Sequence, residues 1–196
     1  MFTAIILAAG LSERMGALKP FLKLDDKTFL EVIIDNLSAF KPEQIIVILN
    51  PQNKILIDQI NSSKLTICIN DQPQLGQFSS LKIAIENINN KNLPFLMCLA
   101  DHPFVKKETY KKILDASQNK TEYVIIPSFE GRKGHPVLFS SNFINNIKSA
   151  DNSITTKDII NDKKEKVMIL NVYDSGILMD TDTPEDFQKF KDVLKN

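Results

Sequence analysis

The sequence predicts an α/β protein with a mostly parallel central sheet and helices on both faces. Over the first hundred or so residues, apolar runs alternate with segments whose apolar residues recur at helical spacing. The runs are apolar throughout, which is typical of strands buried on both faces. Strands that alternate with helices favour parallel pairing through crossover connections. The later predicted strands follow one another closely, so we expect a mixed or antiparallel edge there.

The elements follow in chain order. After an opening apolar run that ends in Ala8 and Ala9, strands are expected at residues 45–49, 65–69, 95–100, 123–126, 136–139, 167–172 and 177–179. Helices are expected at residues 28–40, 54–60, 84–88 with a preceding serine, 106–116, 143–147 and 184–194. Either Ser79 or Ser80 could cap the third of these helices. The Asn- and Lys-rich stretches at 89–92 and 162–166 are interpreted as solvated loops.

Composition narrows the class of protein. A chain of 196 residues suits one domain, or two small lobes that share a core. Its 24 basic and 24 acidic residues balance, so net charge predicts no attraction to nucleic acid or membranes. The opening apolar run is too short to span a bilayer. Cys68 and Cys98 lie within apolar runs, as core cysteines do. We therefore expect a soluble, cytoplasmic protein.

The loop after the opening run carries the groups that bind phosphate. Gly10 can adopt φ > 0 and expose its N–H, Arg14 offers a bidentate fork, and Lys19 a compact positive charge. A P-loop is excluded, because five residues separate Gly10 from Gly16 and the lysine lies three further on. Ser12 stands where a dinucleotide fingerprint needs glycine. The stretch predicts a triphosphate cradle; a lone Gly–Arg pair would instead indicate an ordinary turn.

Acidic residues follow two predicted strands. Asp101 comes directly after the strand at 95–100, where a carboxylate can hold Mg²⁺ beside a nucleotide phosphate. The alternative for Asp101 is a turn with Pro103. Asp180 and Asp182 lie in one extended segment, so both can point to the same side. We interpret Asp182, in preference to Asp180, as the partner of Asp101 in holding Mg²⁺.

The opening stretch also resembles the signature L-A-A-G-x-S-x-R-M-G-x-x-K of nucleotidyltransferases with a glycosyltransferase-A-like Rossmann variant. Within that family the nearest group is the molybdopterin cytidylyltransferases and their relatives. The resemblance implies a three-layer Rossmann-like nucleotidyltransferase fold over residues 1–196, as a single domain whose N-terminal part binds nucleotide and whose C-terminal part binds the acceptor. It implies nucleotide contacts from Leu7, Ala8, Ala9, Gly10, Ser12, Arg14 and Lys19, with catalytic roles for Arg14, Lys19 and Asp101.

Three further segments extend the resemblance. Residues 70–81 are similar to N-P-x-x-x-x-G-x-x-x-S-L, whose serine is associated with the nucleobase, which implies nucleotide binding by Ser79 and Ser80. Residues 101–103 match D-x-P, which implies metal binding by Asp101. Residues 131–139 resemble G-R-x-G-H-P-V-L-F, which lines the acceptor side. That last match implies acceptor contacts from Gly134, His135 and Pro136; the alternative for His135 is a satisfied core or turn histidine.

Three positions depart from the family pattern. Asp26 replaces a usual glycine, which we interpret as a change of turn only. Ala84 replaces a glycine in the helix after the serine motif and could tighten the base pocket. The family's G-D-x-G-x-R segment is eroded at residues 152–157, which leaves the acceptor's identity more open than the nucleotide chemistry.

The function implied is Mg²⁺-dependent transfer of CMP from CTP to a phosphorylated acceptor, with release of pyrophosphate. The family points to molybdopterin as acceptor and to a molybdoenzyme as client. Related guanylyltransferases carry glycine where this chain has Ala9, which favours CTP over GTP. Two alternatives stay open: a sugar or polyol phosphate as acceptor, and a non-catalytic chaperone that carries the molybdenum cofactor.

Overall fold

The computed structural model describes residues 1–11, 19–53, 65–118, 123–151, 153–181, 183 and 186–187. Within them, an eight-stranded sheet has the order β10-β7-β9-β6-β1-β4-β5, with β8 paired to β7. Its strands are β1 (Thr3–Ala8), β4 (Gln44–Leu49), β5 (Leu65–Ile69), β6 (Phe95–Leu99), β7 (Val124–Phe129), β8 (Arg132–Lys133), β9 (Val137–Phe139) and β10 (Val167–Asn171).

The sheet is mostly parallel with a mixed edge, as predicted. β1 pairs in parallel with β4 and β6, and β5 pairs in parallel with β4. β9 runs antiparallel to both β6 and β7, whereas β10 is parallel to β7. Because β9 is reversed, its first residues lie beside the last residues of β6. Segments far apart in the chain therefore meet at the edge where the parallel strands end, the usual ligand edge of such sheets.

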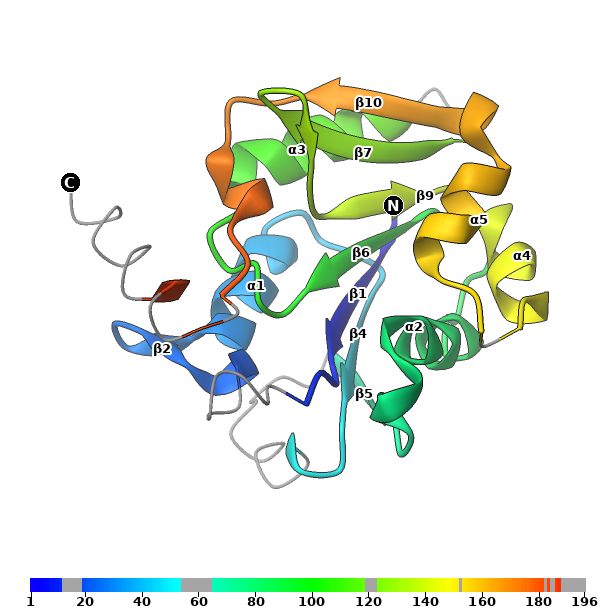
Figure 1. Cartoon of the computed structure of the whole chain (residues 1–196). Coiled ribbons are helices and arrows are strands. Elements are labelled where there is room, and N and C mark those ends of the chain that lie inside the picture. The colour runs from blue at the N-terminus through cyan, green and yellow to red at the C-terminus, as the bar shows by residue number, and fades with distance from the viewer. Residues whose placement is uncertain are drawn as a thin grey trace.

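Helices cover both faces of the sheet and make three layers (Figure 1). The side chains of β1 alternate between two apolar cores, with Ile6 in one and Ile5 in the other. The first core includes residues of α1 (Phe29–Ser38) and α3 (Lys107–Ser117). The second includes residues of α2 (Gln77–Glu86), α4 (Phe143–Ser149) and α5 (Thr156–Asp162). Every residue of β1 and β4 is buried, which confirms strands covered on both faces.

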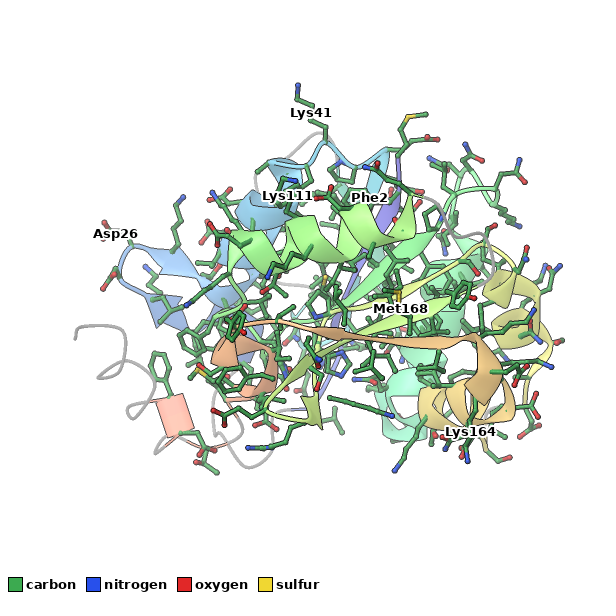
Figure 2. The ribbon with its side chains drawn as sticks, turned by 90° about the horizontal axis from the view of Figure 1, so that it is seen from above. Phe2, Asp26, Lys41, Lys111, Lys164 and Met168 are labelled. Carbon is green, nitrogen blue, oxygen red and sulfur yellow. The ribbon has the colours of Figure 1, made fainter. Side chains whose placement is uncertain are left out.

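Polar signals at the helix ends explain where helices begin. Thr28 caps α1 through a capping box with Glu31. Thr28 also ends a short hairpin of β2 (Lys23–Leu24) and β3 (Lys27–Thr28). Its turn contains Asp25, at φ 53°, and Asp26, which lies at the outer end of the hairpin (Figure 2). The replacement of glycine by Asp26 is therefore accommodated in a turn.

Several predicted elements need correction. The helix after the serine motif begins at Gln77 with Gly76 as its N-cap, so neither Ser79 nor Ser80 caps it. Residues 177–179 form no strand; a 3₁₀ turn, η5 (Ser175–Leu178), replaces it. The buried carboxylate of Asp174 accepts from the Gly176 N–H and so turns the chain there. α5 was not predicted, and its Thr155 cap lies in the eroded segment.

Some predictions fall outside the described residues. The expected helix at 54–60 lies wholly outside them, and of the final helix only residues 186–187 are described, as helical. Cys98 is buried in the core, as expected, and Cys68 is half-buried. Charged side chains such as Lys41 and Lys111 project from the surface in Figure 2, whereas Phe2 is buried. Among the described helices, none has the length and apolar character needed to cross a membrane.

Candidate active site

One pocket lies where β1 and β6 end and α2 begins, and encloses about 200 Å³. It is lined by Leu7, Ala8, Ala9, Gly10, Lys19, Pro20, Pro73, Gly76, Gln77, Ser80, Leu99, Ala100 and Asp101. Most of the residues predicted to contact the nucleotide are therefore brought together. The pocket combines a small-residue backbone turn, a cation, a carboxylate and a hydroxyl, which suits a polar, phosphorylated ligand.

Lys19 and Asp101 face each other across this pocket. Lys19 Nζ lies 3.8 Å from Asp101 Oδ2, and His102 Nδ1 donates to Asp101 Oδ1 at 2.9 Å. Burial acts to raise the pKa of Asp101, but the hydrogen bond from His102 and the charges of His102 and Lys19 outweigh it. The pKa of Asp101 therefore lies below its ordinary value, and its carboxylate stays ionised at neutral pH.

The two serines of α2 share the donor Asn70 but differ in what their own hydroxyl hydrogens contact. Asn70 follows β5 and donates its amide to both Ser79 Oγ and Ser80 Oγ, each at 2.9 Å. Ser79 donates its own hydroxyl hydrogen to the Gly76 carbonyl at 2.7 Å, and it does not line the pocket. Ser80 lines the pocket, and within the described residues its hydroxyl hydrogen has no acceptor. Ser80 therefore has a hydroxyl donor that no described acceptor uses, while Ser79 holds the helix start.

The carbonyls at the end of β1 are held by two asparagines that our sequence reasoning did not select. Asn50 and Asn53, just after β4, donate side-chain amides to the carbonyls of Ala8, Ala9 and Gly10. The sequence feature that could have identified Asn50 was its position directly after a predicted buried strand. We expected Gly10 to adopt a positive φ, but it does not.

The predicted acceptor residues lie beside the pocket and do not line it. Gly134 donates to the Pro127 carbonyl at 2.9 Å, and a Cβ on Gly134 would come within 2.2 Å of the Ile177 carbonyl oxygen. The His135 ring packs edge-on against His102, with centroids 5.2 Å apart. Burial and the charge of His102 lower the pKa of His135 to about 4. These contacts make the segment a packing element next to Asp101.

The remaining predicted residues, Ser12, Arg14 and Asp182, lie outside the described residues. The segment before Asp182 does reach the site, because Thr181 donates its N–H to the Asp101 carbonyl at 3.2 Å. Asp180 is exposed. No three metal-binding side chains cluster within the part of the chain that the structure describes. A single strand-end carboxylate still fits Mg²⁺, which keeps waters and substrate oxygens as its other ligands.

The model of a protein family described as "MobA-like NTP transferase domain" matches residues 4–167 of this chain. The chain belongs to this family. It is thus a nucleotidyltransferase, as the motifs predicted. Its similar proteins include the molybdenum cofactor cytidylyltransferase of Escherichia coli (strain K12), at 27% identity over 93% of this chain and 92% of the relative.

Solved structures of similar shape support the same fold. Rv0371c from Mycobacterium tuberculosis H37Rv superposes with a TM-score of 0.83 at 22% identity, over 97% of both chains. A complex of Rv0371C from the same strain with manganese gives a TM-score of 0.80 at 21% identity, over 97% of this chain and 98% of the other. The three-layer Rossmann-like fold implied by the motifs is confirmed.

Proposed function

We propose that this nucleotidyltransferase acts in the cytoplasm and transfers CMP from CTP to molybdopterin, releasing pyrophosphate. The observation that carries the proposal is the pocket in which Lys19, Asp101 and the Ser80 hydroxyl meet beside the end of β1. The similarity to a cytidylyltransferase over nearly the whole length of both chains supports the base and the acceptor.

The chemistry requires charge neutralisation and alignment more than a covalent catalyst. A phosphate oxygen of the acceptor attacks the α-phosphorus and forms a new P–O bond. The bond to the bridging oxygen breaks, and its electron pair leaves with pyrophosphate. Lys19, only 13% exposed at its side chain, would offset negative charge on the phosphates, with Arg14 assisting.

Asp101, with Asp182 as its proposed partner, would hold Mg²⁺. The divalent ion supplies positive charge at the phosphates when it is bound. His102 occupies the first carboxylate oxygen of Asp101, so the second oxygen, which lies 3.8 Å from Lys19 Nζ, is the one that would meet the ion. The manganese complex of the mycobacterial structure supports a divalent ion at this fold without selecting magnesium.

The base preference rests on Ser80 and Ala9. Ser80 presents a donor that suits the carbonyl oxygen or ring nitrogen of cytosine. Ala9 is among the residues that line the pocket, where its methyl group would restrict a purine. Ala84 contributes nothing there: it is fully buried in the core beneath α2 and does not line the pocket, which corrects our expectation of a tighter base pocket.

A second candidate competes with molybdopterin as the acceptor. Thr155, in the eroded segment, caps the start of α5 and is hydrogen-bonded to Asp158, so its side chain is committed to the helix end. Because the family's G-D-x-G-x-R segment on the acceptor side is not retained, a sugar or polyol phosphate remains the second candidate. Transfer to molybdopterin would make a molybdoenzyme the client of the product.

The test measures pyrophosphate release with each of the four nucleoside triphosphates and Mg²⁺, with molybdopterin or a panel of sugar and polyol phosphates as acceptor. We expect release with CTP and molybdopterin only. Release with CTP and a sugar phosphate alone would replace the acceptor. Tight binding of molybdopterin with no release under any combination would favour the chaperone.

A further inference from the structure

Two buried asparagines at the end of β4 hold the chain where it leaves β1. Asn50 and Asn53 are 1% and 0% exposed. Asn50 Nδ2 donates to the carbonyl oxygens of Ala9 and Gly10, both at 3.2 Å. Asn53 Nδ2 donates to the carbonyl oxygen of Ala8 at 3.0 Å. Two side chains thus donate hydrogen bonds to three consecutive backbone carbonyls at the end of β1.

The direction of these bonds is fixed by the protein. Asn50 Oδ1 accepts from the Asn53 backbone N–H at 2.9 Å, so the amide nitrogen of Asn50 must be the atom that faces Ala9 and Gly10. A carbonyl oxygen can only accept, so the side chain opposite it has to donate. Neither a carboxylate nor an aliphatic side chain could take this place.

Holding the carbonyls also orients the amides. In a planar trans peptide the N–H points away from the C=O of the same unit, and among the described residues the single cis bond is His135–Pro136. The N–H groups of Ala9, Gly10 and Leu11 are therefore turned away from the β4 side. β6, which ends in the segment of Asp101, lies on the other side of β1.

Two of these three amides, those of Gly10 and Leu11, are available to a ligand. Within the described part of the chain, no protein acceptor pairs with the N–H of Gly10 or Leu11, and Gly10 lines the pocket that also holds Lys19. Successive backbone N–H groups that face one open space form a concavity that binds anions. The charge that would fill it is a phosphoryl group.

We propose that Asn50 and Asn53 are positioning residues that aim the amides after β1 at the phosphates of a nucleotide. The inference rests on the proposed function for the identity of the ligand. It assigns no contact between the asparagines and the nucleotide, because both are buried behind the backbone that they hold.

The probe is inorganic triphosphate with Mg²⁺, so that base recognition plays no part. Asn50→Leu keeps the approximate size of the side chain and adds no charge, but it removes the donor. We expect its Kd for triphosphate, measured by calorimetry, to rise roughly tenfold, the effect of losing aligned hydrogen bonds. Asn87→Leu is the matched control, because it also removes a side-chain amide that donates to a backbone carbonyl, but at an exposed position that does not line the pocket; it should leave this Kd unchanged.

A spectroscopic readout separates positioning from general stability. The chain has six glycines, so ¹⁵N-glycine labelling gives a simple amide spectrum, in which Gly10 is assigned by its loss in Gly10→Ala. The Gly10 amide should shift on adding triphosphate to the wild type, and should shift little in Asn50→Leu at the same concentration. If Asn50→Leu does not fold, Asn53→Leu decides, with a smaller loss in the same direction.

The outcomes are distinguishable. A folded Asn50→Leu or Asn53→Leu protein with wild-type triphosphate affinity and a wild-type Gly10 shift would overturn the positioning role alone. A wild type that binds triphosphate through the Gly10 amide but releases no pyrophosphate with any acceptor would overturn the proposed function and leave the positioning role standing.

Discussion

Gly10 and Gly134 stand at the same edge of the sheet, yet they do opposite things. A Cβ on Gly10 would meet nothing within 4 Å, because the residue borders the open pocket. A Cβ on Gly134 would come within 2.2 Å of the Ile177 carbonyl oxygen. The first glycine leaves space for a ligand, and the second allows its own segment to pack closely against the backbone of Ile177. Both belong to motifs of the same family, so a motif glycine does not by itself indicate a binding contact.

The contrast extends to the residues around each glycine. On the nucleotide side, Lys19, Asp101 and Ser80 present polar atoms to the pocket. On the acceptor side, His135 has its Nδ1 buried, with no hydrogen-bond partner among the described residues. The segment predicted to bind nucleotide thus presents polar atoms to an open pocket, whereas the segment predicted to bind the acceptor packs through His135 against His102, which contacts Asp101.

The largest expected effect is on the nucleotide side. Asp101→Asn keeps the size of the side chain and removes its charge, so turnover should fall by roughly 10³-fold, the scale of losing a group that stabilises transition-state charge. The melting temperature should change little. Asp71→Asn, on the exposed turn after β5, is the control for the same chemical change. Turnover near wild type in Asp101→Asn would remove the magnesium interpretation.

On the acceptor side the largest effect should be on stability. Gly134→Ala forces the Ile177 backbone to move, which should lower the free energy of unfolding by about 2 kcal/mol, as overpacking does. Gly10→Ala, with open space, should stay within about 0.5 kcal/mol. Urea denaturation of both variants measures the difference. Equal stability of the two variants would show that the comparison between these glycines is wrong.

His135 should make stability depend on pH. Its folded pKa, about 4, lies below the ordinary histidine value, so between these pH values the unfolded chain binds more protons. Stability is fully present above about pH 6.5 and is lost as the pH falls toward 4, by about 2 kcal/mol at pH 5. His135→Gln should remove this slope in denaturation series at pH 7 and pH 5. A wild type without the slope would mean that His135 is not neutralised by burial.

The two serines offer a finer comparison within α2. Ser80→Ala removes the donor that faces the pocket and should weaken CTP binding by roughly fivefold, the value of one hydrogen bond. Ser79→Ala should leave CTP affinity unchanged but lower the free energy of unfolding by about 1 kcal/mol, since the Gly76 carbonyl loses its donor. Calorimetry with CTP and urea denaturation measure the pair. A reversed pattern would exchange the two roles.

The smallest effect concerns base selection. Ala9→Gly removes the methyl group of a residue that lines the pocket and should raise GTP turnover relative to CTP by about threefold. This is less than the roughly tenfold that one methylene group gives in an apolar pocket, because polar residues also line this one. Competition between the two triphosphates in one reaction measures the ratio. Equal use of GTP and CTP by the wild type would contradict selection at this position.

The sequence by itself determined most of the long strands, the class of fold and the family. Continuous apolar runs predicted β1 and β4 as strands buried on both faces, and both are. The opening motif indicated a nucleotidyltransferase. These features are local, because apolar runs and motifs consist of residues that are adjacent in the sequence. Such patterns can be recognised without knowing which segments pack against them.

Only the tertiary structure decided which side chains cooperate. Asn50 lies 41 positions along the chain from Ala9, and His102 meets His135 because β9 runs antiparallel beside β6. Strand order and direction set these partners, and no local pattern encodes them. The start of α2 at Gln77 and the turn in place of the strand at 177–179 have the same origin, since Asn70 holds both serines and Asp174 ties η5 to α3. Sequence patterns predict what a segment is, whereas its partners depend on the fold that brings distant segments together.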